Sequence, residues 1–327
     1  MVVRSARGLL FSLLCLPALA AAQDPDDARG WLERMREAVR ERNYIGTFVY
    51  RHRGQLETLR IIHRAGPGGE RERLYSLNGS AREIIRDNDK VTCILPDDKS
   101  VLVDNRPPGN PFADWVPEDI AALGEHYEFR LGADGRIAGR PAKALHIRPR
   151  DNYRYGYQLW LDKASGLMLG ASLHNDAGEA VEQLLFTSLD TPQSIDEALL
   201  QPGASGEGFT WYRGQERGGA GSSAEDASAW SVAKLPPGFT LLRRYQHEGR
   251  EATGPREHLL FSDGLASVSV YIEPLAGMPV FDGMSRMGAV NAYGRQLDDH
   301  QITAMGEVPA ATVRAIANAV RRIGGGG

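Results

Sequence analysis

A strict alternation of apolar and polar residues recurs in segment after segment from residue 44 to about residue 189. This pattern constrains the fold more than any other feature of the chain, and it is clear in residues 127–131, 145–148 and 155–161. A period of two is typical of strands that bury one face, and its repetition over many short segments indicates antiparallel pairing. The sequence therefore predicts one large antiparallel sheet whose apolar face needs a cover or a ligand.

Turn residues separate the alternating segments. The dipeptides Asn78-Gly79 and Asp134-Gly135 and the segment 175–178 supply residues that adopt positive φ readily, as tight hairpins require. These positions are expected to connect neighbouring strands of the sheet.

A single amphipathic helix is predicted ahead of the sheet. Asp24 is suited to cap a helix that has Pro25 at its first position. Apolar residues then recur at intervals of three and four: Ala28, Trp31, Leu32, Met35, Ala38 and Val39. Such a stripe is typical of a helix that lies across a sheet.

The first residues indicate export. Arg4 and Arg7 precede an apolar stretch at 8–20, and small residues then offer cleavage after Ala20 or Ala22. This is the pattern of a signal peptide over residues 1–22, and it is too short for a spanning helix, which needs roughly 18 apolar residues or more. A lipid-modified Cys15 is the alternative, but Leu14 stands before it where that processing site wants Gly or Ala.

Composition divides the rest of the chain into three parts. Residues 23–200 hold the helix and the large β domain. Residues 201–228 are rich in Gly, Ser and Ala, which predicts a flexible linker. Residues 229–327 alternate again and end in an apolar stripe after Pro309, which predicts a small α+β domain with a terminal helix.

Two features leave alternatives open. The Pro-rich interruption at 105–123 carries Phe112 and Trp115, which either pack over the open face of the sheet or form a lid on a ligand. Cleavage of the signal peptide leaves Cys93 as the lone cysteine, so no internal disulfide forms. Cys93 is then either a small buried hydrophobe or a reactive thiol.

The charged residues and the motifs exclude several classes of function. The net charge is −4 and the basic residues are interspersed with acids, which argues against a nucleic-acid partner. The segment 203–207 fails the G-x-S-x-G pattern at its last position, and no His spacing matches a metal site. The sequence predicts no catalytic residues, no metal and no cofactor, with a secreted hydrolase as a disfavoured alternative.

An ordered series of segments across the whole mature chain resembles the MucB/RseB family, with the pseudomonad MucB branch nearest. The segments that carry the resemblance are residues 43–51, 56–64, 72–74, 82–86, 153–157, 159–162, 235–239 and 264–273. No one of them is diagnostic alone, and the order of the series makes the resemblance specific.

The resemblance implies a fold, a location and a function. The implied fold is α+β, with a strongly curved, unclosed β-barrel similar to LolA and LolB, helices across its concave side, and a smaller α+β C-terminal domain. The implied protein is a periplasmic regulator of the sigma-E type envelope stress response. It would bind the periplasmic segment of a membrane-spanning anti-sigma factor of the RseA or MucA type and shield it from the site-one protease. Lipopolysaccharide or a related lipid would displace it.

The residues suggest two sets of site candidates. Inward-facing candidates for a lipid cavity are Phe48, Tyr50, Leu59, Ile61, Tyr75, Trp115, Tyr127, Phe129 and Trp160. Each of these residues could instead belong to the core, and a bulge would reverse the face assignment. Candidates for partner contacts in the second domain are Phe239, Arg244, Tyr245 and Tyr271, because aromatic and Arg side chains dominate interaction hot spots.

The main alternative function is a periplasmic lipid or lipoprotein carrier. The second domain and its linker argue against it, since a simple carrier has no evident use for them. Self-association is left open by the sequence.

Overall fold

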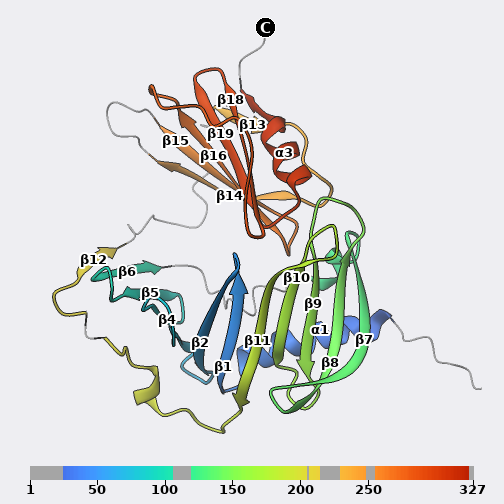
Figure 1. Cartoon of the computed structure of the whole chain (residues 1–327), viewed down its shortest axis with the longest axis vertical. Coiled ribbons are helices and arrows are strands. Elements are labelled where there is room, and N and C mark those ends of the chain that lie inside the picture. Colours follow the sequence, from blue (N-terminus) through green and yellow to red (C-terminus); the bar gives the residue numbers. More distant parts are fainter. Residues whose placement is uncertain (1–24, 106–118, 205, 214–228, 248–254, 324–327) are drawn as a thin grey trace, which may run out of the picture.

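The computed structural model describes residues 25–105, 119–204, 206–213, 229–247 and 255–323. These residues form a large curved sheet with a helix across it and a smaller domain at one end of that sheet (Figure 1). Phe112, Trp115 and the predicted signal peptide lie outside the described residues.

The large sheet has 12 strands in the order β12-β6-β5-β4-β3-β2-β1-β11-β10-β9-β8-β7. Their bounds are β1 Tyr44–His52, β2 Gln55–Arg64, β3 Arg71–Ser76, β4 Glu83–Asp87, β5 Lys90–Leu95, β6 Ser100–Asn105, β7 Tyr127–Ile137, β8 Arg140–Pro149, β9 Gly156–Asp162, β10 Met168–His174, β11 Ala180–Asp190 and β12 Thr210–Arg213. All pairs are antiparallel except β12 with β6. Because β7 and β12 are edges that do not pair with each other, the sheet is curved but unclosed, and this part of the prediction is confirmed.

Helix α1 (Pro25–Glu41) fills the concave face of the sheet. Five residues of its predicted apolar stripe are buried in the core: Ala28, Leu32, Met35, Ala38 and Val39. The short helix α2 (Ile120–Leu123) adds Ile120 and Leu123 to the same cluster. Burying a Leu or Met side chain contributes about 1.5–3 kcal/mol, so the chain's own helix satisfies much of the need for a cover.

The turns follow the predictions at most positions but not at Asp134-Gly135. Strand β7 continues through Gly135, with a register shift between Leu131 and Asp134, and the hairpin turns at Ala138 and Gly139 (φ 48° and 75°). A Cβ at position 135 would come 2.5 Å from the Trp160 ring. Gly135 therefore makes room for an indole, and the packing of a distant side chain overrides the local turn signal.

The smaller domain has a six-stranded sheet in the order β14-β15-β16-β19-β18-β17 and a two-stranded sheet of β13 and β20. The bounds are β13 Trp230–Val232, β14 Thr240–His247, β15 Arg256–Ser262, β16 Ser267–Pro274, β17 Gly283–Met287, β18 Val290–Leu297, β19 His300–Gly306, α3 Ala310–Ala319 and β20 Val320–Arg322. Helix α3 buries Val313 and Ile316 against the six-stranded sheet of this smaller domain. The terminal helix ends at Ala319, and the next residue, Val320, belongs to β20 and pairs with Val232.

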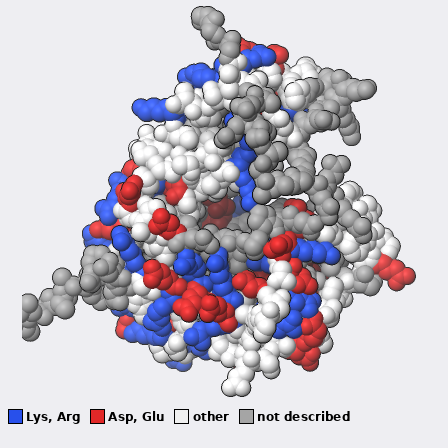
Figure 2. Space-filling view, turned by 180° about the vertical axis from the view of Figure 1, so that it is seen from behind, with Lys and Arg blue, Asp and Glu red and all other residues white. Residues whose placement is uncertain are grey.

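The convex face of the large sheet carries interleaved charges rather than a basic patch. Arg64 and Arg71 both pair with Glu197 of the short 3-10 helix η1 (Glu197–Leu200), and Arg73 pairs with Glu83. Figure 2 shows basic and acidic side chains mixed over the lower part of the face that it presents. Within the described ranges, no helix is long and apolar enough to cross a membrane.

Candidate functional site at the domain junction

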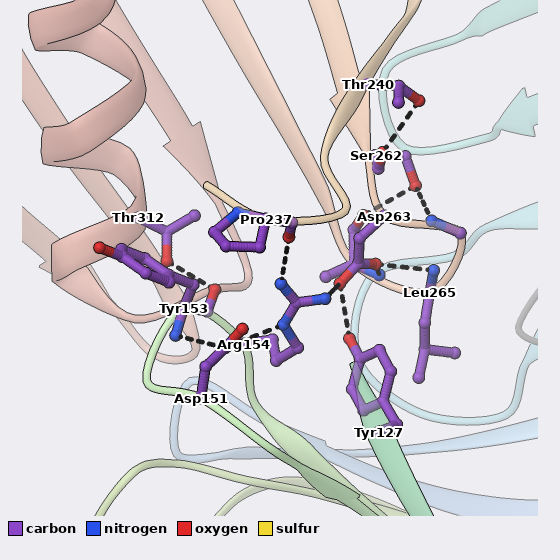
Figure 3. Close-up of polar contacts among 12 residues, drawn as sticks. Tyr127, Asp151, Tyr153, Arg154, Pro237, Thr240, Ser262, Asp263, Leu265 and Thr312 are labelled. Atoms are coloured by element: carbon purple, nitrogen blue, oxygen red, sulfur yellow. Dashed lines mark hydrogen bonds and ion pairs between the residues drawn. The ribbon is translucent and has the colours of Figure 1, made fainter. Parts of the chain in front are cut away.

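Arg154, in the loop between β8 and β9, joins the two domains. Its side chain is fully buried, and its guanidinium donates to three oxygens (Figure 3). Nη1 donates to Asp263 Oδ2 at 2.7 Å, and Nη2 donates to the carbonyl of Pro237 at 2.5 Å. Nε donates to Asp151 Oδ1 at 3.0 Å, within its own loop. One side chain of the large domain thus holds two loops of the smaller domain.

Asp263 is as deeply buried as its partner. Its side chain has no solvent exposure, and Oδ2 also accepts a hydrogen bond from the Tyr127 hydroxyl at 2.9 Å. Oδ1 accepts from the backbone N–H groups of Leu265 at 2.9 Å and Ala266 at 2.7 Å. A buried ion pair is tolerated only when its remaining hydrogen-bonding capacity is also satisfied, and here each carboxylate oxygen has two donors.

Two aromatic rings lie beside the guanidinium. The Tyr127 ring centroid is 5.3 Å from Arg154 Cζ, and the Phe239 ring centroid is 5.4 Å from it. Both distances are within the range for cation–π attraction, which is stronger where water is excluded. Burial, together with the Asp263 charge, raises the pKa of Tyr127, so its hydroxyl stays protonated and remains a donor.

Further contacts surround this ion pair. Thr312 Oγ1 donates to the carbonyl of Tyr153 at 2.6 Å, and Asn291 Nδ2 donates to the hydroxyl of Tyr155 at 2.9 Å. Tyr155 also packs with Ala289 and Leu173 in a small cluster that spans both domains. The two domains are therefore held together by hydrogen bonds and apolar packing in addition to the Arg154–Asp263 ion pair.

A pocket of about 260 Å³ lies beside the junction, between the two domains. Residues of both domains line it: Tyr50, Tyr157, Ala171, Leu173, Glu182, Gln183 and Leu184 from the large domain, and Leu265, Ala266, Ser267 and Glu307 from the smaller one. Seen from behind, the surface is hollowed between the domains, and acidic atoms are visible in the hollow (Figure 2). The pocket combines aliphatic and aromatic walls with two carboxylates.

The two carboxylates of the pocket differ in their partners. Glu182 Oε2 accepts a hydrogen bond from the Tyr50 hydroxyl at 2.7 Å. Burial, and next the negative charge of Glu182, raise the pKa of Glu307, whereas Arg53 and His52 oppose that shift. Two negative charges, on Glu182 and Glu307, repel each other across this pocket. Protonation of Glu307, or a wider spacing of the two domains, would reduce that repulsion.

Most of the predicted lipid-binding residues belong to a closed core. Phe48, Leu59, Ile61, Tyr127 and Phe129 are buried in the cluster that α1 covers, whereas Tyr50 lines the interdomain pocket. A second space, lined in part by α1, measures about 10 Å³, which is about what one water molecule needs. The concave face as folded is packed, and the larger space lies between the domains.

One of the predicted inward-facing residues, Tyr75, lies on the opposite face of the sheet, and its assignment to the inner face is wrong. Leu74 is the residue that pairs with Ile61 and faces the core, so Tyr75 points the other way and packs with Ile62 and Leu200.

Trp160 is half-buried and packs against the edge of the core cluster, although it alternates along β9 with the buried residues Leu159 and Leu161. Its ring lies over Gly135 and Gly170, on the side where Leu185 is exposed. Alternation in the sequence fixes which residues share a face but not which of the two faces is covered.

The predicted partner residues fall into two groups. Phe239 is buried beside Arg154, and Arg244 Nη1 donates to Glu257 Oε2 at 2.8 Å, so both have structural partners. Tyr245 and Tyr271 stack on either side of His258, with ring centroids 5.3 Å and 4.5 Å away, and both are partly exposed. Their role in binding a partner stays a prediction.

Sequence reasoning missed the central pair of the junction. In the sequence, Asp263 stands in an Asp-Gly pair that is typical of turns, and Arg154 lies within the segment 153–157 that carries the family resemblance. The two residues are 109 positions apart, and no local pattern links them. Among the described residues, no group of His, Cys, Asp and Glu has an arrangement that could hold a metal ion.

Comparison with known proteins gives a consistent family. The model of the MucB/RseB N-terminal domain matches residues 27–204, and that of the MucB/RseB C-terminal domain matches residues 224–321. The sigma factor AlgU regulatory protein MucB of Pseudomonas aeruginosa is 38% identical over 96% of this chain and 95% of the relative. The sigma-E factor regulatory protein RseB of Haemophilus influenzae is 26% identical over 94% and 95%.

Solved structures agree over both domains. The complex of Pseudomonas aeruginosa MucA and MucB matches with a TM-score of 0.73 and 34% identity, covering 90% of this chain and 99% of the solved one. A structure of MucB with the periplasmic part of MucA gives 0.71 at 34% identity over 90% and 99%. MucB solved alone gives 0.63 at 32% identity over 91% and 98%.

Proposed function

Because the chain belongs to the MucB/RseB family, we propose that it binds the periplasmic segment of a membrane-spanning anti-sigma factor of the MucA or RseA type and shields that segment from the site-one protease. The protein would act in the periplasm, after removal of residues 1–22, as a regulator without catalysis. The relatives are named as regulators of sigma factors, and MucB has been solved with the periplasmic part of MucA.

The observation that carries the proposal is the match of the whole two-domain chain, not of one domain. The chain superposes better on the two complexes that contain MucA (TM-scores 0.73 and 0.71) than on MucB alone (0.63). These higher scores over both domains support the proposal that the arrangement of the domains and the binding of a partner are linked.

The junction provides a physical basis for that link. A partner shifts the arrangement of two domains only by its differential affinity for the alternatives. The Arg154–Asp263 ion pair favours one arrangement, since separating the domains would strip two buried charges of their partners. A segment that contacts both domains in this arrangement would bind a surface that is already assembled.

Release by lipopolysaccharide or a related lipid is the second part of the proposal. Because α1 fills the concave core, an acyl chain would enter the pocket of about 260 Å³ between the domains. Burying a chain there contributes about 0.8 kcal/mol per methylene and would wedge the walls formed by Tyr50 and Leu265 apart. Lipid and anti-sigma segment would then prefer different arrangements and bind antagonistically.

The test is a protection assay on the periplasmic segment of the cognate anti-sigma factor. The site-one protease is activated by its peptide, and cleavage is followed with the protein added, alone or with lipopolysaccharide. The proposal expects protection at stoichiometric protein and its loss with lipid, whereas a neutral phospholipid vesicle leaves it intact. Unchanged cleavage at stoichiometric protein would contradict the regulator, and protection that persists with lipid would remove the lipid part.

The alternative function, a lipid or lipoprotein carrier, has less support. A carrier needs an accessible apolar cavity, and the described core holds α1 in that place. Co-purified acyl chains without binding to an anti-sigma segment would favour it.

A further inference from the structure

Strand β12 differs from every other strand of the large sheet. It comes from the segment 201–228, which the sequence predicts to be a flexible linker, and it pairs in parallel with β6, which would be the edge of the sheet without it. Thr210 N–H donates to the carbonyl of Lys99 at 2.8 Å, and Trp211 and Tyr212 lie opposite Val101 and Leu102. A piece of the interdomain connection thus occupies the edge of the sheet.

The side chains of β12 contribute little to holding it there. Trp211 is 49% exposed and Tyr212 is 58% exposed, and Thr210 is exposed as well. The closest packing is that of the Trp211 ring, which lies over Gly206 and near Val101. Strand β12 has only four residues and buries little side-chain surface, so backbone hydrogen bonds are its main attachment to the sheet. Its ladder is parallel, and parallel pairing is less stable per residue than antiparallel pairing.

Strand β6 beneath it is firmly part of the sheet. It pairs with β5 over six residues, Ser100 and Val101 are buried, and Leu102 is 43% exposed. If β12 leaves, β6 exposes a row of unpaired backbone groups, and such an edge is a template for an extended peptide because main-chain pairing does not depend on sequence. Val101 and Leu102 present one apolar contact on each face of the sheet.

We propose that β12 is an exchangeable internal ligand, and that the β6 edge is where an extended segment of a protein partner adds to the sheet. This inference rests on the proposed function and specifies how the anti-sigma segment would be held. The matching partner sequence has an aromatic or aliphatic residue at each of two neighbouring positions, as Trp211 and Tyr212 do. Docking of β12 reduces the apparent affinity of the β6 edge to its intrinsic affinity multiplied by the fraction of time that the edge is free.

The experiment compares binding of the full-length protein to the periplasmic segment by calorimetry or fluorescence anisotropy. Thr210→Pro removes the N–H that bonds Lys99, and Thr210→Val is the matched control because it keeps that N–H and a strand-forming side chain. If β12 is docked about nine-tenths of the time, Thr210→Pro tightens binding on the order of tenfold and Thr210→Val leaves it unchanged.

A second variant locks β12 in place. Ser100 and Thr210 are direct neighbours across the ladder, so Ser100→Cys with Thr210→Cys, in a Cys93→Ser background, places two thiols for a disulfide. The oxidised form is expected to bind the segment at least tenfold more weakly than the same protein after reduction. Thermal unfolding of each variant confirms that the sheet itself is intact.

The outcomes separate this inference from the proposed function. Equal binding by wild type, Thr210→Pro and both redox forms of the locked variant would overturn the exchange at β6 and leave the proposed function standing. Weaker binding by Thr210→Pro would also overturn it, since β12 would then be a direct contact and not a competitor. No binding by any form, wild type included, would overturn the proposed function and this inference together.

Discussion

The interior of the large sheet and the domain junction are both buried, but they are built differently. The interior is apolar and filled by α1, so that Leu32 and Met35 have no exposure at all. The junction buries a charged pair, Arg154 and Asp263, with every carboxylate oxygen bonded. Apolar packing is non-directional, whereas a charged pair is favourable in one geometry only. The comparison suggests that the interior supplies stability and the junction supplies a defined arrangement of domains.

The strongest way to break the comparison is to remove one partner of the buried pair. Asp263→Ala leaves the Arg154 charge buried and uncompensated, and a loss of about 3–5 kcal/mol in the free energy of unfolding is expected. Urea unfolding measures this loss. Asp282→Ala removes an exposed carboxylate of the same domain and should change stability by less than about 0.5 kcal/mol. Equal effects of the two substitutions would show that the pair does not hold the junction.

A core substitution should cost a similar or smaller amount without moving the domains. Leu32→Ala in α1 is expected to lose about 2–5 kcal/mol through lost burial and the cavity left behind. The neighbouring exposed residue provides the control, Glu33→Ala, which should be nearly neutral. Small-angle scattering of the folded Leu32→Ala protein should match wild type, and a changed profile would contradict the division of roles.

A smaller effect is expected from a neutral contact of the junction. Thr312→Val removes the hydroxyl that donates to the carbonyl of Tyr153, and the expected loss is about 0.5–1.5 kcal/mol. Thr191→Val, at an exposed position of the large domain, is the matched change. A loss as large as that of Asp263→Ala would mean that the hydrogen bonds, and not the ion pair, dominate the junction.

The smallest effect concerns pH. The pKa of Glu307 is raised in the folded protein by burial and by Glu182, so the protonated form is favoured on folding. Its contribution is present below the ordinary pKa of a glutamate and is lost as the pH rises through the raised value. Glu307 lines the pocket, where neighbouring protein atoms desolvate its carboxyl group, but the residue is also open to solvent, so screening keeps the effect small.

Glu307→Gln should therefore stabilise the junction slightly at pH 7 and flatten the dependence of stability on pH just above the ordinary range of a glutamate. Thermal unfolding of wild type and variant across that range measures the difference. A variant that loses stability at pH 7 would contradict the assignment.

Much of the fold could be predicted because its signals are local. The alternation of residues predicts the strands, the stripe from Ala28 to Val39 predicts α1, and Gly79 and Gly178 take positive φ at predicted turns. The predicted turn at Asp134-Gly135 failed because the Trp160 ring needs the space beside Gly135. Tyr75 was assigned to the wrong face because a period of two does not say which face the helix covers.

The candidate site could be predicted only in part. Phe239 reaches the junction, but Arg154 and Asp263 meet across the sequence with no shared motif, since the contact exists only once both domains have folded. Strand β12 could not be predicted from its Gly-rich segment, because its formation depends on the available edge of β6 and not on the strand propensity of its own residues.

The central claim is that the Arg154–Asp263 pair fixes the arrangement of domains that binds the anti-sigma segment. The most direct measurement is the distance distribution between spin labels at the exposed positions Leu185 and Leu242, one in each domain, in a Cys93→Ser background during titration with the segment. The account predicts a single narrow distribution with the pair intact. With Asp263→Ala it predicts a broad distribution that the segment narrows, at weaker affinity. A narrow distribution and unchanged affinity in the Asp263→Ala protein would contradict it.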